Sequence, residues 1–171
     1  MSELLIAGNK TGFQPDKPPP VGTAEHALWL VHWHFTWENP VDVAKLSDLY
    51  HDDIVWEVPS RRVVYRGKKN VIDNYLRIFE STEGLKQVPV ERYATPTRVF
   101  DDCDANFTLI SGHGFPGHPM PVGSQVAMRL VHNFHIKDGL IARENGYEVW
   151  RSPSADRHCV EFGHSRLPKR R

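Results

Sequence analysis

Residues 124–137 alternate between apolar and polar side chains, and this pattern limits the fold more than any other feature of the chain. From Val126 to Ile136 every second residue is apolar except His132. Because successive side chains of a strand point to opposite faces, the segment predicts a long strand with one buried face. Burying an imidazole without a partner costs about 1–3 kcal/mol. His132 is therefore either a core histidine bonded to backbone or an acid–base group in an apolar pocket.

The turn that follows this strand decides which residues of the next strand face His132. A three-residue hairpin loop over 137–139 places Glu144 opposite His132 and keeps Glu148 on the same face. A two-residue Asp-Gly turn instead places Asn145 opposite His132 and turns both glutamates outward. The sequence leaves both registers open.

A third segment, 105–113, also alternates, and it changes from apolar to polar toward its end. If it pairs with the histidine-bearing strand, the three-residue loop brings His113, His132 and Glu144 into one cavity. Such a set suits proton transfer, because histidine titrates near neutrality and a carboxylate fixes its tautomer and stabilises its cation.

Composition excludes several classes of protein. The 171 residues fit one domain, and 21 basic residues balance 21 acidic ones. The only basic run is 169–171, so we do not expect nucleic acid as a partner. No apolar run reaches about 18 residues and no signal peptide is evident, so we do not expect a membrane. Two cysteines, Cys103 and Cys159, form no disulfide framework and favour a cytoplasmic location.

The chain divides into a flexible or extended arm (1–23), a folded domain (24–151) and a polar tail (152–171). Helices first and an antiparallel sheet afterwards are typical of an α+β fold. The periodicities predict helices over 24–38, 42–50 and 67–80, an irregular stretch over 61–66, and strands over 54–59, 86–100, 105–113, 124–137 and 140–150.

Several motifs resemble the nuclear transport factor 2-like superfamily, specifically its SnoaL-like branch. The resemblance rests on LYHDDIVWEVP at 49–59, YRGK at 65–68 and FHIKDGLI at 134–141. The segment GHGFPGHP at 112–119 is also similar to the phenazine-biosynthesis A and B proteins. The resemblance covers 24–151. It implies a cone-shaped α+β barrel in which three N-terminal helices pack on a curved, mostly antiparallel sheet that encloses a pocket.

The resemblance also implies roles for three histidines. His132 occupies the position of the acid/base aspartate of SnoaL polyketide cyclases. His113 falls where those cyclases carry a pocket histidine, and His34 falls where ketosteroid isomerases place their oxyanion-binding tyrosine. Each also has a structural interpretation: His34 as a helix-end residue, for example, and His113 as a brace for a glycine-rich loop.

Other positions depart from the family. Val58 replaces the general-base aspartate of ketosteroid isomerases. Glu57, one residue earlier, aligns with the water-binding asparagine of limonene epoxide hydrolases, but the alternation of strand 54–59 sends it outward, and both orientations stay open. Gly146 replaces the catalytic acid of the hydrolases and the phenazine proteins.

These observations predict an enzyme that uses histidine and glutamate acid–base chemistry on an apolar, cyclic or polyketide-like small molecule. The reaction would be a cyclisation, dehydration, isomerisation or condensation. The predicted catalytic residues are His132, Glu144, His113, His34 and Glu57. The predicted substrate-binding residues are Trp33, Trp56, Val58, Tyr75, Phe79, Met128, Leu130 and Glu148. The alternatives are a non-catalytic small-molecule-binding or dimerisation module and an epoxide hydrolase, against which Gly146 argues.

No cofactor is expected. His32 and His34 are two residues apart on a predicted helix, so they point away from each other, and no third ligand has supporting spacing. We therefore predict no metal site. Because family members often pair through the outer face of the sheet, the resemblance also implies a homodimer.

Overall fold

The computed structural model describes residues 5–7 and 17–154. Two α-helices, α1 (Ala24–Trp37) and α2 (Lys68–Glu80), and two short 3-10 helices, η1 (Val43–Asp48) and η2 (Pro59–Arg61), lie within these ranges. The strands are β1 (Leu5–Ala7), β2 (Tyr50–Val58), β3 (Val63–Arg66), β4 (Thr82–Thr95), β5 (Arg98–Leu109), β6 (Gln125–Lys137) and β7 (Leu140–Arg151).

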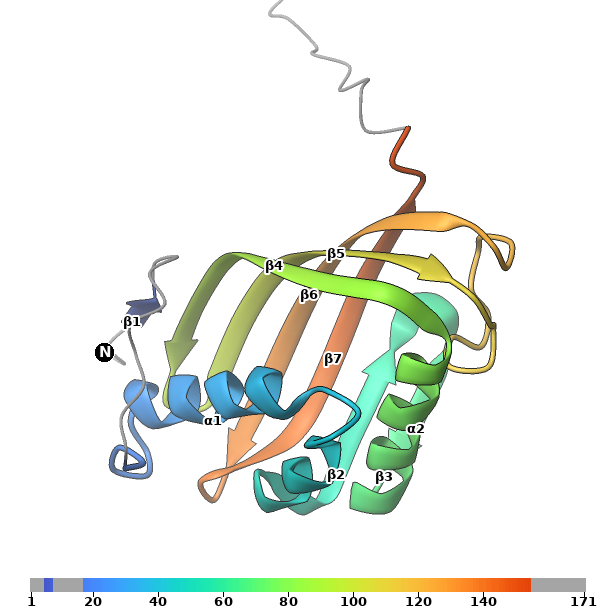
Figure 1. Cartoon of the computed structure of the whole chain (residues 1–171). Coiled ribbons are helices and arrows are strands. Elements are labelled where there is room, and N and C mark those ends of the chain that lie inside the picture. Colours follow the sequence, from blue (N-terminus) through green and yellow to red (C-terminus); the bar gives the residue numbers. More distant parts are fainter. Residues whose placement is uncertain (1–4, 8–16, 155–171) are drawn as a thin grey trace, which may run out of the picture.

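The strands form one curved sheet in the order β1-β4-β5-β6-β7-β2-β3. Every pairing is antiparallel except that of β2 with β7, which is parallel. Both α-helices lie on the same side of the long strands β4–β7 (Figure 1). The predicted α+β architecture, with helices packed on a curved and mostly antiparallel sheet, is confirmed. No helix among the described residues is long and apolar enough to cross a membrane.

The predicted inward face of β6 is also confirmed. All six of its members are at most 8% exposed: Val126, Met128, Leu130, His132, Phe134 and Ile136. Burial on every second residue, as the alternation predicted, therefore places His132 in the interior of the sheet.

Some element boundaries differ from the predicted ones. The segment 42–50 contains a 3-10 helix and the start of β2 instead of an α-helix. The predicted strand 86–100 crosses a turn, because β4 ends at Thr95 and β5 begins at Arg98. Part of the irregular stretch 61–66 is strand β3. Within the predicted N-terminal arm, β1 pairs with β4. Most of the tail, 155–171, lies outside the described residues.

The β6–β7 hairpin combines a short turn with a bulge, and neither predicted register is right. Asp138 and Gly139 both have positive φ, 52° and 76°, as a two-residue type I′ turn requires. The register then shifts by one residue near Ala142. Gly146, not Glu144 or Asn145, consequently lies opposite His132. The extra residue restores the inward orientation of the glutamates that the short turn alone would reverse.

Candidate active site

A mainly apolar cavity lies between the sheet and α2. Its polar lining comes from Glu38, Gln87, His132, Glu144 and Glu148. The rest of the wall consists of Trp56, Val58, Tyr75, Ile78, Leu85, Ala105, Phe107, Phe115, Met128, Leu130 and Gly146. An apolar enclosure with a few converging polar groups is the usual form of a small-molecule site.

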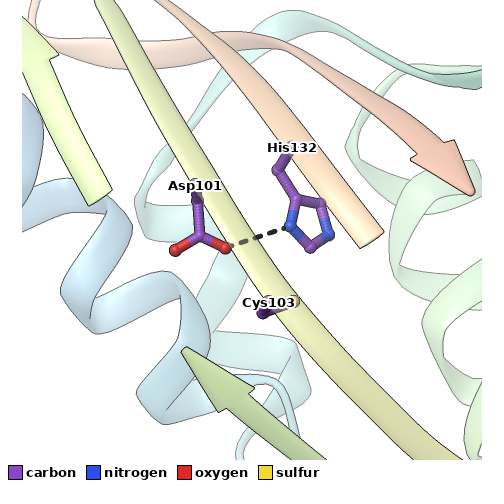
Figure 2. Close-up of side chains that lie close together, drawn as sticks. All are labelled: Asp101, Cys103 and His132. Atoms are coloured by element: carbon purple, nitrogen blue, oxygen red, sulfur yellow. Dashed lines mark hydrogen bonds and ion pairs between the residues drawn. The ribbon is translucent and has the colours of Figure 1, made fainter. Parts of the chain in front are cut away.

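His132 is held by an aspartate that the sequence analysis missed. Asp101 of β5 is its direct cross-strand neighbour, and Asp101 Oδ2 lies 3.2 Å from His132 Nδ1 (Figure 2). The Nε group of Arg92 donates to the other carboxylate oxygen of Asp101 at 2.7 Å. The three residues form a row of alternating charge in which Asp101 and His132 are buried and Arg92 is partly exposed. Nε2 is the ring nitrogen of His132 that Asp101 does not engage.

The groups around His132 favour its cationic form at neutral pH. Burial by itself lowers the pKa of His132, but hydrogen bonds with Asp101 and Cys103, together with the charges of Asp101 and Glu144, outweigh burial and raise this pKa well above its usual value. Burial raises the pKa of Asp101. The hydrogen bond and charge of His132 and the charge of Arg92 outweigh burial and hold this pKa below its usual range.

Cys103 completes a cluster of potential metal ligands beside His132. The ligand-type atoms of Asp101, Cys103 and His132 all lie within 4.8 Å of one another, and all three side chains are buried (Figure 2). Aspartate, thiolate and imidazole are donors that zinc accepts. However, the guanidinium of Arg92 already shares the Asp101 carboxylate and repels a cation there. The contacts therefore favour a role for Asp101 in positioning His132.

Glu144 lies in the cavity wall as predicted but does not hydrogen-bond His132. Its Oε1 accepts from the indole N–H of Trp56 at 3.1 Å and from the hydroxyl of Tyr75 at 2.7 Å. Its Oε2 is buried without a hydrogen-bond partner among the described residues. Burial raises the pKa of Glu144, while the charge of His132 and the two hydrogen bonds oppose that rise.

His34 lies behind the cavity wall and is fully buried. Its Nδ1 is 3.2 Å from the Tyr50 hydroxyl, and its Nε2 is 3.3 Å from the Tyr75 hydroxyl. Burial and the positive charges of His132 and Arg92 lower the pKa of His34 to about 3, so the ring is neutral. It contacts the groups of the site and does not line the cavity.

Glu38 is a second carboxyl group of the site that the sequence analysis missed. It follows the last residue of α1, and its side chain is 8% exposed. Gln87 donates to its Oε1 at 3.1 Å, whereas its Oε2 is buried without a hydrogen-bond partner among the described residues. Burial, together with the charge of Glu144, raises the pKa of Glu38 to about 8. Glu38 therefore keeps its proton at neutral pH.

Glu148 lines the cavity but is fully engaged by protein groups. Arg61 of η2 donates to both of its oxygens, at 2.8 and 3.0 Å, and Trp150 donates to Oε2 at 2.7 Å. Arg61 also donates to the carbonyl of Pro116, which belongs to the glycine-rich loop between β5 and β6. The pair therefore fixes this loop at the cavity wall.

Four predicted site residues lie elsewhere. His113 is exposed in the loop after β5, because that strand ends at Leu109 before the alternation reaches it. Glu57 points to the other face of β2, where Arg143 pairs with it at 3.0 Å. Trp33 and Phe79 are partly buried against the core and are not among the residues that line the cavity. Six of the predicted substrate-binding residues do line the cavity: Trp56, Val58, Tyr75, Met128, Leu130 and Glu148.

A curved sheet around N-terminal helices, with acid–base groups in an apolar cavity, defines an α+β domain of the nuclear transport factor 2-like class. The chain belongs to the SnoaL-like domain family of that superfamily. The match to this family covers residues 31–144. No curated protein matches the sequence significantly.

Three solved structures with the same fold are distant from this chain in sequence. A candidate SnoaL-like polyketide cyclase from Jannaschia sp. CCS1 is 18% identical, with a TM-score of 0.60 over 80% of this chain and 91% of that one. An epoxide hydrolase of the limonene-hydrolase type from M. tuberculosis is 16% identical (TM-score 0.57, 74% and 84% covered). A protein with a ketosteroid isomerase-like fold from Catenulispora acidiphila DSM 44928, in complex with trimethylamine, is 15% identical (TM-score 0.51, 69% and 83% covered). At these identities the likeness extends to the fold alone.

Proposed function

We propose that this protein is an enzyme that transfers protons on a small, mainly apolar molecule with a carbonyl group. The observation that carries the proposal is His132: a buried imidazole, paired with the Asp101 carboxylate, in the wall of an apolar cavity. A fixed cation in a site of low polarity stabilises the negative charge that develops on a carbonyl oxygen when its α-proton is removed.

Glu144 is the group suited to remove that proton. It lines the same cavity, and the N–H of Trp56 and the hydroxyl of Tyr75 hold its Oε1, so the second oxygen is left for a substrate. Burial raises the pKa of Glu144 and so makes the carboxylate a stronger base than an exposed one. In this proposal Asp101, not Glu144, orients His132.

The experiment is proton exchange of ketones in D2O, which tests the chemistry before the natural substrate is known. Cyclic and aryl ketones are incubated with the protein, and the loss of α-protons is followed by NMR. We expect exchange above the buffer rate for at least one ketone, and a fall of about 10²–10⁴-fold in His132→Asn. His132→Asn must remain folded, which its unfolding midpoint checks.

The alternative is a binding module of the same fold, and the same experiment separates the two. If ketones shift the NMR signals of cavity residues without any exchange, the protein binds small molecules and does not turn them over. Epoxide hydrolysis has less support, since Gly146 stands where the hydrolases carry their acid.

We also propose that the protein forms a homodimer through the outer face of the sheet. Apolar side chains are exposed there on β7, with Tyr147 at 47% and Val149 at 55%, and Tyr93 stacks on Phe100 beside them. Exposed apolar clusters of this kind are typical of interaction sites. Light scattering should give twice the chain mass for the wild type and the single-chain mass for Tyr147→Glu; a monomeric wild type contradicts the proposal.

A further inference from the structure

The hydrogen bonds around His34 leave two carboxyl oxygens of the site without a donor. Tyr75 has one hydroxyl proton, which it donates to Glu144 Oε1, so its oxygen accepts from the Nε2–H of His34. The hydroxyl of Tyr50 then donates to His34 Nδ1. Nothing in this arrangement donates to Oε2 of Glu144 or Oε2 of Glu38, although both atoms are buried.

These two oxygens flank one nitrogen atom. His34 Nε2 lies 3.5 Å from Glu38 Oε2 and 3.8 Å from Glu144 Oε2. Both glutamates also line the cavity. Buried polar atoms without partners are rare in proteins, and two of them on side chains that line one cavity point to a ligand or a proton that engages them.

The surroundings of the two carboxyl groups favour opposite protonation states. Glu144 has the imidazolium of His132 nearby and two hydrogen-bond donors on Oε1, all of which favour its ionised form. Among the described residues, the one hydrogen-bond donor to Glu38 is the neutral amide of Gln87, and the charge of Glu144 repels a second negative charge there. When two neighbouring acids are held in different states, one can act as a base while the other acts as an acid.

We propose that Glu144 and Glu38 act as base and acid on one substrate, and that the reaction is the elimination of water from a β-hydroxy ketone or its reversal. The inference rests on the proposed function, because it uses His132 to hold the ketone oxygen. It adds to that function the acid, the leaving group and the class of substrate.

The steps balance without an additional reactant. Glu144 takes the α-proton, and the electron pair of the C–H bond forms an enolate whose oxygen faces the His132 imidazolium. The pair then forms the C=C bond while the bond from the β-carbon to the hydroxyl breaks, and the departing oxygen takes the proton of Glu38 and leaves as water. One proton must then return from Glu144 to Glu38, and the water just formed can carry it.

The test compares benzylacetone, a plain ketone, with its β-hydroxy derivative, which loses water to give a conjugated enone with strong ultraviolet absorption. Exchange of the plain ketone in D2O needs the base and the cation only, whereas elimination also needs the acid. In Glu38→Gln we expect the ratio of elimination rate to exchange rate to fall by about 10²-fold or more. His132→Asn should lower both rates, and Glu57→Gln, the outward glutamate, should change neither.

Separate results decide the proposed function and this inference. If wild-type protein exchanges no ketone, the proposed function itself is wrong. If it exchanges ketones but eliminates water from none of a panel of aryl and alkyl β-hydroxy ketones, or if the ratio is unchanged in Glu38→Gln, the inference is wrong and the proposed function stands. A second measurement does not depend on turnover: ¹³C NMR of labelled glutamate carboxyl groups should show one signal titrating near pH 8, and that signal should be absent in Glu38→Gln.

Discussion

Glu144 and Glu148 lie on the same face of β7 and line the same cavity, but their surroundings differ. Both oxygens of Glu148 accept hydrogen bonds from Arg61, and Trp150 adds a third. Glu144 receives two hydrogen bonds on one oxygen and, from the part of the chain that the structure describes, none on the other.

The difference separates a carboxylate that holds structure from one that is available for chemistry. Glu148 forms a buried ion pair that also ties the loop at Pro116, so its charge is used within the protein. Glu144 and the nearby Glu38 each have one buried oxygen without a hydrogen-bond partner among the described residues, which costs stability. Proteins tolerate such local violations mainly at functional sites.

The largest expected effect comes from breaking the satisfied pair. Arg61→Met leaves Glu148 buried and unpaired, and removing one partner of a buried ion pair typically costs about 3–5 kcal/mol. We expect a loss of that size in the free energy of unfolding, measured with urea. Lys45→Met, which breaks the exposed pair with Asp42, should cost less than about 1 kcal/mol. Equal losses would mean that Arg61 and Glu148 do not behave as a buried pair.

A smaller effect is expected from Tyr75→Phe, which sharpens the comparison at Glu144. The change removes the hydroxyl that donates to Glu144 at 2.7 Å and contacts His34. A hydrogen bond to a charged group contributes about 1.5–3 kcal/mol, and we expect a loss in that range. The pKa of Glu144 should also rise further, since one donor to its ionised form is gone. An unchanged carboxyl titration in ¹³C NMR would contradict this assignment.

The smallest effect is a pH dependence at Glu38. Its pKa rises from 4.5 to about 8 on folding, so between these values the folded protein holds a proton that the unfolded chain has released. This contribution to stability is fully present below pH 4.5 and is lost as the pH rises toward 8. Between pH 5 and pH 8 we therefore expect Glu38→Gln to gain at least about 1 kcal/mol in free energy of unfolding relative to wild type. A constant difference across this range would show that Glu38 titrates normally.

Periodicity predicted the parts of the fold and site that depend on alternation within one strand. The buried face of β6, the position of His132 on it and the location of Trp56 and Val58 in the cavity wall all follow from a period of two. The family resemblance added the curvature of the sheet and the pocket that it encloses.

The missed and misplaced residues depend on where strands begin and end. Asp101 faces inward in step with Ala105 and Phe107, so extending that alternation backward would have found it, but the predicted strand began too late. The same strand was extended too far at its other end, which placed His113 in the cavity wrongly. Glu38 is the last residue of the predicted helix 24–38 and comes four residues after His34, so helical spacing would have placed the two side chains on one face.

The extra residue near Ala142 determines which face of the sheet every later side chain of β7 occupies. If β7 ran without the bulge and kept every residue, its inner and outer faces would be exchanged from that point on, and Asn145 would face the cavity in place of Glu144. The chemistry of the site thus depends on a residue without a functional group. Comparisons of related chains that count positions without allowing for this bulge will therefore assign their acid–base residues to the wrong face.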